Sequence, residues 1–177
     1  MENTGQPCNA PTRLFVPAER HDEIAEQAAE IAKALRVGDP REEATDVGPI
    51  VSRVHLGRVR NYIEIGRQEG ARLMTGGAEP VEGLAPGYFV KPTVFAHVTP
   101  EMTIAREEIF GPVLSILSYG EEEEAIRMAN DTPYGLAAYV SSEDREHALS
   151  VARRLRAGQV HVNMTIPGAE VPFGGYK

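Results

Sequence analysis

The stretch of sequence that decides the fold is VLSILSYGEEEEAIRMANDTPYGLAAYVSSEDREHALSVARRLRAGQVHVNM, residues 113–164. It holds apolar runs at 113–118, 137–141 and 159–164, separated by segments with helical spacing at 121–130 and 144–157. Strands that alternate with amphipathic helices are typical of crossover units, in which a helix returns the chain to a neighbouring parallel strand. We therefore predict an α/β fold with a largely parallel, twisted sheet covered by helices.

The same alternation extends toward the N-terminus. Residues 13–16 form a short apolar run, and a helix is predicted over 18–37 because apolar residues recur there at three- and four-residue steps. Its predicted buried stripe consists of Ile24, Ala28, Ile31, Ala32 and Leu35. A second helix is expected over 52–69, with Val59, Tyr62 and Ile63 inward, and strands over 71–74 and 88–98, where Pro92 interrupts the run.

Composition limits the class of protein. The 177 residues, 42% hydrophobic and 25% charged, suit one globular domain with a genuine core. A net charge of -8 disfavours a nucleic-acid partner. No basic leader and no apolar run of roughly 18 residues occurs, so no membrane partner is expected. The single cysteine, Cys8, excludes an intramolecular disulfide and favours a reducing, cytoplasmic setting.

Cys8 is the first candidate for chemistry. It lies in GQPCNAPTR, residues 5–13, a segment rich in small residues and proline that suggests a loop. An accessible thiolate is a strong nucleophile, especially near a cation or a helix N-terminus. The alternative is a small buried hydrophobic side chain, and composition alone favours that alternative.

A second candidate is EEIFGPV, residues 107–113, which places two carboxylates and an aromatic just before a strand. A carboxylate on a loop can accept hydrogen bonds from ribose hydroxyls, and an aromatic beside it can hold a flat ring. A solvated acidic turn with one core phenylalanine is about as plausible locally.

The final PFGGYK, residues 172–177, combines aromatics with glycines that permit close backbone approach, a weak signal by itself.

Metal and phosphate sites lack a sequence signal. The five histidines are His21, His55, His97, His147 and His161, and they show no ligand spacing. The acidic run 121–124 is more simply the solvated first turn of a helix. No glycine-rich phosphate loop follows a strand. We therefore predict no metal and no complete nucleotide cradle within this chain.

Four segments, taken in order, resemble the aldehyde dehydrogenase superfamily. They are GQPC at 5–8, EEIFGPV at 107–113, NDTPYGLA at 130–137 and PFGGYK at 172–177. The resemblance extends between these motifs and covers essentially all 177 residues. It implies the Rossmann-like catalytic domain of that fold.

The resemblance also implies a role for individual residues. Cys8 would attack an aldehyde to form a thiohemiacetal, lose a hydride to NAD or NADP, and leave a thioester that water hydrolyses to a carboxylic acid. Glu108 would contact the nicotinamide ribose, Phe110 would lie beside the nicotinamide, and His55 would make a further ribose contact. Asn163 and Phe173 would lie near the substrate tunnel.

Complete members of the superfamily are much longer than this chain. Residues 1–177 are therefore expected to be the catalytic domain alone, without the cofactor domain and the C-terminal oligomerisation segment. The cofactor domain carries the general-base glutamate and the oxyanion asparagine, so the isolated chain is expected to be inactive, and a homo-oligomer is expected of the whole enzyme. One alternative is a catalytically silent truncated domain or an interaction module with exposed apolar surface. Another is residual thiol chemistry, such as slow ester hydrolysis by Cys8.

Overall fold

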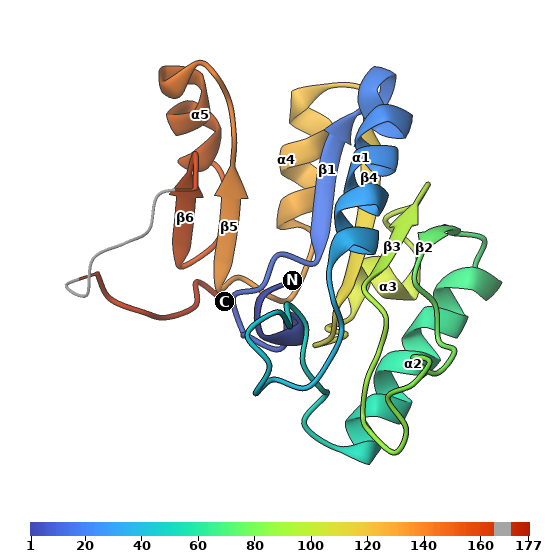
Figure 1. The fold of residues 1–177 in the computed structure, drawn as a ribbon. Coiled ribbons are helices and arrows are strands. Elements are labelled where there is room, and N and C mark those ends of the chain that lie inside the picture. The colour runs from blue at the N-terminus through green and yellow to red at the C-terminus, as the bar shows by residue number, and fades with distance from the viewer. Residues whose placement is uncertain (165–170) are drawn as a thin grey trace. The chain divides into compact units, whose positions relative to one another are not determined.

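The computed structural model describes residues 1–164 and 171–177, and its elements are shown in Figure 1. The chain forms two compact units, residues 1–118 and residues 119–177. The sequence predicts one domain without a linker, whereas the described strands fall into a four-stranded and a two-stranded sheet. Because each sheet has its own hydrogen-bonded partners, each unit is described by itself.

The first unit is built on a sheet with the strand order β1-β4-β3-β2. These strands span Arg13–Pro17 for β1, Arg72–Thr75 for β2, Thr93–Ala96 for β3 and Val113–Tyr119 for β4. Strands β3 and β4 are parallel, with Thr93 opposite Val113, and β2 pairs antiparallel with β3. The strand predicted over 88–98 is shorter than expected, because Pro92 has no backbone N–H to give to a ladder.

Helix α1 spans His21–Ala34 and follows a short 3-10 turn, η2, over Ala18–Arg20. Its buried face is made of Ala25, Ala29 and Ala32. The predicted stripe is wrong at Ile31, whose side chain is 67% exposed. Ala25 and Ala32 share a core cluster with strand residues such as Val94, Ala96 and Ile116. Small alanine side chains let a helix approach a sheet closely, so the larger side chains of the strands fill this part of the core.

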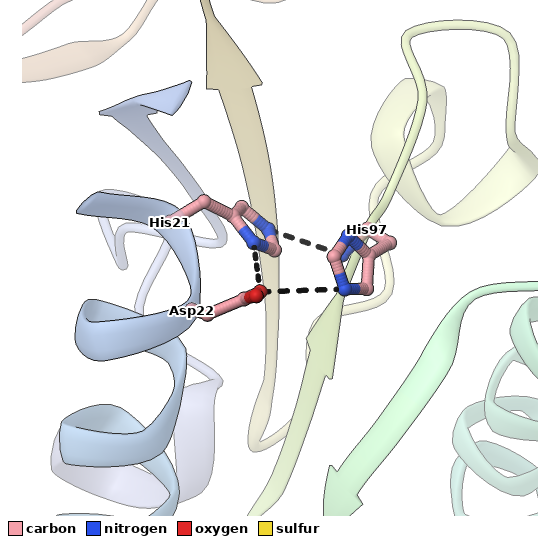
Figure 2. Close-up of side chains that lie close together, drawn as sticks. All are labelled: His21, Asp22 and His97. Atoms are coloured by element: carbon pink, nitrogen blue, oxygen red, sulfur yellow. Dashed lines mark hydrogen bonds and ion pairs between the residues drawn. The ribbon is translucent and has the colours of Figure 1, made fainter. Parts of the chain in front are cut away.

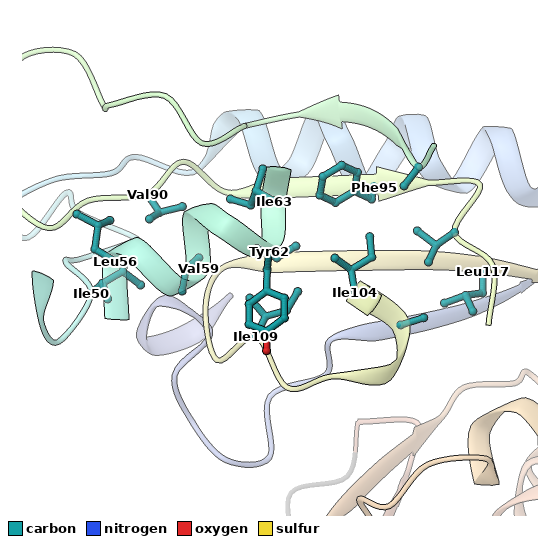
Figure 3. Close-up of a cluster of buried hydrophobic side chains, with 14 residues drawn as sticks. Ile50, Leu56, Val59, Tyr62, Ile63, Val90, Phe95, Ile104, Ile109 and Leu117 are labelled. Carbon is teal, nitrogen blue, oxygen red and sulfur yellow. The ribbon is translucent and has the colours of Figure 1, made fainter. Parts of the chain in front are cut away.

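Helix α2 spans Arg53–Gln68. Ser52 is its N-cap residue, and the Ser52 Oγ accepts a hydrogen bond of 3.2 Å from the His55 N–H. Val59, Tyr62 and Ile63 are buried, as predicted, within the larger core cluster shown in Figure 3. One element was not predicted, the short helix α3 over Thr103–Arg106. The carboxylate of Glu69 accepts from the Thr103 N–H at 2.8 Å, so a residue remote in sequence caps it.

The second unit repeats the predicted alternation. It contains α4 (Glu122–Asn130), β5 (Ala137–Val140), α5 (Arg145–Ala152) and β6 (Gln159–Val162). Strands β5 and β6 are parallel and α5 is the crossover between them, as predicted, although α5 ends at Ala152. The C-terminal residues lie on this unit, where the Tyr176 N–H donates to the Gly135 carbonyl at 2.8 Å.

None of the helices in residues 1–164 and 171–177 combines the length and the apolar composition that a membrane-spanning helix requires.

Candidate active site

Cys8 lies in a tight turn near the N-terminus of the first unit. The turn is closed by the Ala10 N–H, which donates to the Pro7 carbonyl at 3.1 Å. The Cys8 side chain is exposed and its thiol is free. It is therefore not the small buried hydrophobic residue that composition alone favours, and the thiol is open to small molecules.

The segment before Cys8 is fixed by close backbone contacts. Gly5 has a φ of +67°, and a Cβ at this position would lie 2.2 Å from the Gly111 carbonyl oxygen. Only glycine allows two backbones to approach so closely in this conformation. The Thr4 hydroxyl donates to the Gly48 carbonyl at 3.1 Å, and the Gln6 side-chain oxygen accepts from the Val51 N–H at 3.0 Å. Gly5 thus sets the residues before Cys8 against Gly111, while the Thr4 and Gln6 side chains fix them to residues 48–51.

The segment 107–111 is also held by hydrogen bonds from helix α2. Phe110 has a φ of +58°, which is uncommon for a residue with a side chain. Its carbonyl accepts a hydrogen bond of 2.7 Å from His55 Nε2, and the two rings meet edge to face with centroids 6.1 Å apart. The Glu108 carbonyl accepts from Arg58 Nη2 at 3.3 Å. Helix α2 thus fixes the backbone on which Glu108 and Phe110 are carried.

Buried neighbours anchor the same segment. Ile109 is 1% exposed, whereas the Glu108 side chain beside it is exposed. The Tyr62 hydroxyl donates to a Glu107 carboxylate oxygen at 2.7 Å. Burial raises the pKa of the Tyr62 hydroxyl, and the hydrogen bond to Glu107 acts in the same direction. The anchor residues leave the Glu108 carboxylate available to a ligand.

The structure changes the interpretation of His55. A carbonyl oxygen can only accept a hydrogen bond, so the His55 Nε2 must carry the proton that it shares with Phe110. One ring nitrogen is therefore used for the main chain, and only Nδ1 is left for any ribose contact. His55 is in the first place a positioning residue for Phe110.

Asn163 and Phe173 belong to the second unit. The Asn163 side-chain oxygen accepts from the Ser142 N–H at 3.0 Å, and its φ is +51°. Phe173 is 62% exposed. Cys8, His55, Glu108 and Phe110 all lie in the first unit. The expected roles of Asn163 and Phe173 near a substrate tunnel stay predictions.

Sequence reasoning missed two supporting residues, Arg58 and Tyr62, as parts of the site. Arg58 Nη2 lies 3.4 Å from the Tyr62 hydroxyl, and its guanidinium lies 5.6 Å from the centre of the Tyr62 ring. Their four-residue spacing on a helix was a usable signal, because side chains at that spacing are neighbours. The spacing could not show that Arg58 and Tyr62 contact the distant segment 107–111.

Comparisons with known proteins identify the family of this chain. A sequence model described as Aldehyde dehydrogenase family matches residues 1–177. A putative aldehyde dehydrogenase of Staphylococcus aureus and a 3-succinoylsemialdehyde-pyridine dehydrogenase of Pseudomonas sp. are each 49% identical over the whole chain. The chain spans 37% of the length of each of these relatives.

Solved structures show the same likeness. An aldehyde dehydrogenase mutant from Pseudomonas syringae, in complex with NAD+ and octanal, has a TM-score of 0.96 and 48% identity, covering 98% of this chain and 36% of its own. An aldehyde dehydrogenase of Mycobacterium tuberculosis complexed with NAD+ has a TM-score of 0.95 and 44% identity, with 98% and 36% covered. A family match over every residue and a shared fold at this identity lead to one conclusion. The chain belongs to the aldehyde dehydrogenase family.

Proposed function

We propose that residues 1–177 are the cysteine-bearing catalytic domain of an NAD(P)-dependent aldehyde dehydrogenase that oxidises an aldehyde to a carboxylic acid. The observation that carries the proposal is the pairing of an exposed Cys8 thiol with the segment of Glu108 and Phe110, joined through the close approach of Gly5 to Gly111. A nucleophile and a ring-binding loop on one rigid frame suit covalent capture followed by hydride loss.

In the proposed reaction the Cys8 thiolate attacks the aldehyde carbon. A carbon–sulfur bond forms, and the carbonyl electron pair moves to the oxygen, giving the oxyanion of a thiohemiacetal. When bound, the oxidised nicotinamide would supply the acceptor for a hydride: the carbon–hydrogen bond breaks with its electron pair, and the pair on the oxygen restores the carbonyl. The acyl group then remains on Cys8 as a thioester. Water adds to the thioester carbon, the carbon–sulfur bond breaks, and the carboxylic acid leaves with the thiol restored.

The residues of segment 107–111 fit part of a nicotinamide nucleotide. Glu108 has an exposed carboxylate, an acceptor that suits ribose hydroxyls, and its backbone is fixed through Arg58. Phe110 is held by His55 in a left-handed conformation, which sets the direction of an aromatic ring suited to a flat partner. The sequence has no glycine-rich phosphate loop. This chain would therefore supply the nicotinamide end of the site, with the phosphates held elsewhere.

The remaining functions are proposed to lie in the part of the enzyme that these 177 residues do not cover. The chain matches 37% of the length of the relatives, and NAD+ is present in the solved complexes of two neighbours. The general base, the oxyanion amide and the phosphate contacts would come from that part, so the isolated chain is expected to be inactive. In the whole enzyme the partners would be an aldehyde, NAD or NADP, and further copies of itself.

A chimera tests the proposal. Residues 1–177 replace the matching region of the Staphylococcus aureus relative, and the absorbance of reduced cofactor is followed with a panel of aldehydes and either NAD+ or NADP+. We expect turnover in the chimera, none in its Cys8→Ala variant, and none in the isolated chain. A folded chimera without turnover, or turnover that survives Cys8→Ala, would reject the assigned role of Cys8.

One observation favours the second candidate, an interaction module. Val51 is 79% exposed and Val54 is 84% exposed, and the Val51 N–H is bonded to Gln6 beside the Cys8 turn. Exposed apolar side chains next to a functional turn suit cover by another protein surface. Two measurements distinguish the candidates. A silent module is expected to self-associate by light scattering, and the double variant Val51→Ser, Val54→Ser is expected to be monomeric. A catalytic domain is expected to show activity in the chimera.

A further inference from the structure

Three side chains with metal-binding atoms lie close together in the first unit (Figure 2). His21 and Asp22 open helix α1, and His97 follows strand β3. Their ligand atoms lie within 4.8 Å of one another. Among the residues that the structure describes, this is the group of histidine and carboxylate side chains close enough to share one ion. The sequence predicts no metal site, because the histidines show no ligand spacing, and His21 and His97 are 76 residues apart.

His21 serves as a support in this group. Its ring is buried, and its Nε2 accepts a hydrogen bond of 3.2 Å from the His97 backbone N–H. That nitrogen must be unprotonated, so Nδ1 carries the ring proton and donates to Asp22 Oδ1 at 3.0 Å. With both nitrogens used, His21 has no lone pair for an ion. It instead holds the His97 backbone at a φ of +53° and orients the Asp22 carboxylate.

Asp22 and His97 have the spacing of two ligands on one ion. Asp22 Oδ1 and His97 Nε2 are 3.4 Å apart, longer than a good hydrogen bond. Two donors about 2.0–2.1 Å from a tetrahedral ion are separated by about 3.4 Å. Both side chains face solvent, being 70% and 51% exposed, so water can complete the coordination shell. The hydrogen bond from His97 to His21 is donated by the His97 backbone N–H, so the ring Nε2 of His97 remains for an ion.

We propose that Asp22 and His97, positioned by His21, form a surface site for a divalent transition-metal ion of the Zn²⁺ class. Imidazole with carboxylate is a ligand pair that Zn²⁺ accepts, and Mg²⁺ or Ca²⁺ would prefer oxygen ligands throughout. The buried support is what separates this pair from an ordinary surface contact, because metal ligands are oriented by hydrogen-bonded neighbours. Arg72 is a nearby cation that favours the charged Asp22 carboxylate and opposes a bound ion. The site is therefore weaker than one with three protein ligands.

The chain offers a matched control on its second unit. His147 Nε2 lies 2.5 Å from Glu122 Oε2, with both side chains partly exposed. This pair has the same chemistry, but at a direct hydrogen-bond distance that leaves no place for an ion between the atoms. Zn²⁺ binding that belongs to any histidine beside a carboxylate would be the same at both pairs.

The test titrates ZnCl₂ into the whole chain by calorimetry, in a Cys8→Ser background that removes the competing thiol. We expect one site, weakened more than about tenfold by His97→Gln and by Asp22→Asn, and unchanged by His147→Gln. Circular dichroism checks that each variant folds. No Zn²⁺ binding by the parent protein, equal affinity in all variants, or loss in His147→Gln alone would overturn the proposal.

Ring ¹⁵N NMR separates ligand from support. With Zn²⁺ the His97 Nε2 signal is expected to move to the metal-bound position, while His21 keeps its proton on Nδ1. A His21 signal that moves in place of His97 would overturn the assignment of His21 as the positioning residue.

Discussion

Replacing Gly5 with alanine tests the contact that joins the Cys8 turn to the segment of Glu108 and Phe110. Gly5 has a φ of +67°, and its added Cβ would lie 2.2 Å from the Gly111 oxygen and 2.5 Å from the Gly111 carbonyl carbon. An alanine in the left-handed conformation costs about 1–2 kcal/mol. Overlap with backbone cannot be relieved by a rotamer change, and overpacking adds about 1–3 kcal/mol. We expect Gly5→Ala to lower the free energy of unfolding by about 2–5 kcal/mol.

Gly83→Ala is the matched control. Gly83 has a similar φ of +74°, but a Cβ there would have no atom within 4 Å. It isolates the conformational cost, which is about 1–2 kcal/mol. Both variants are compared by urea denaturation followed by circular dichroism, and the chimera with Gly5→Ala is expected to lose turnover. If the two variants lose the same stability, the close approach of Gly5 to Gly111 does not hold the Cys8 turn, and the reasoning fails.

The remaining predictions concern three other places in the first unit. In the chimera, His55→Ala should raise the KM for NAD+ by about tenfold, because one hydrogen bond to the Phe110 carbonyl is lost. His55→Gln should restore most of the affinity for NAD+. An unchanged KM in His55→Ala would contradict the positioning role. The Asp39 carboxyl should titrate with a pKa of about 2, because the Arg41 side chain donates hydrogen bonds to it. The stabilisation of the fold by this ion pair is present above the unfolded-state pKa of about 4 and is lost as the pH falls toward the folded-state pKa. Carbon NMR checks this, with Arg41→Ala expected to return the pKa to the ordinary range. Gly57→Ala, on the open face of α2 with no atom within 4 Å, should stabilise the chain by about 1 kcal/mol, and a loss on thermal unfolding would count against that geometry.

The order of helices and strands could be predicted from sequence because it depends on local periodicity. The helices at 53–68 and 122–130 and the strands at 13–17 and 113–119 lie where the apolar spacing placed them. The stripe of α1 was misjudged at Ile31, since spacing alone does not say whether alanines or larger residues face a sheet. Helix α3 could not be predicted because its cap, Glu69, is 34 residues away.

The residues of the candidate site were predicted as a set of motifs, whereas the contacts that fix them were not predicted. Nothing local to His55 indicates that its ring holds the backbone of a residue 55 positions later. The meeting of His21 with His97 depends on how β3 is placed beside α1, which is a property of the folded sheet. Long-range hydrogen bonds of this kind follow from tertiary structure and leave no period in the sequence.

The anchoring of the Cys8 turn and of Phe110 within residues 1–118 has an evolutionary consequence. The expected reactive groups are fixed by contacts within residues 1–118, while the expected tunnel residues Asn163 and Phe173 belong to residues 119–177. Under the proposed function, substitutions in the second unit would lie outside the contacts that fix the Cys8 turn and Phe110. Under the proposed function, enzymes of this kind would vary in the aldehydes they accept while keeping the same oxidation chemistry.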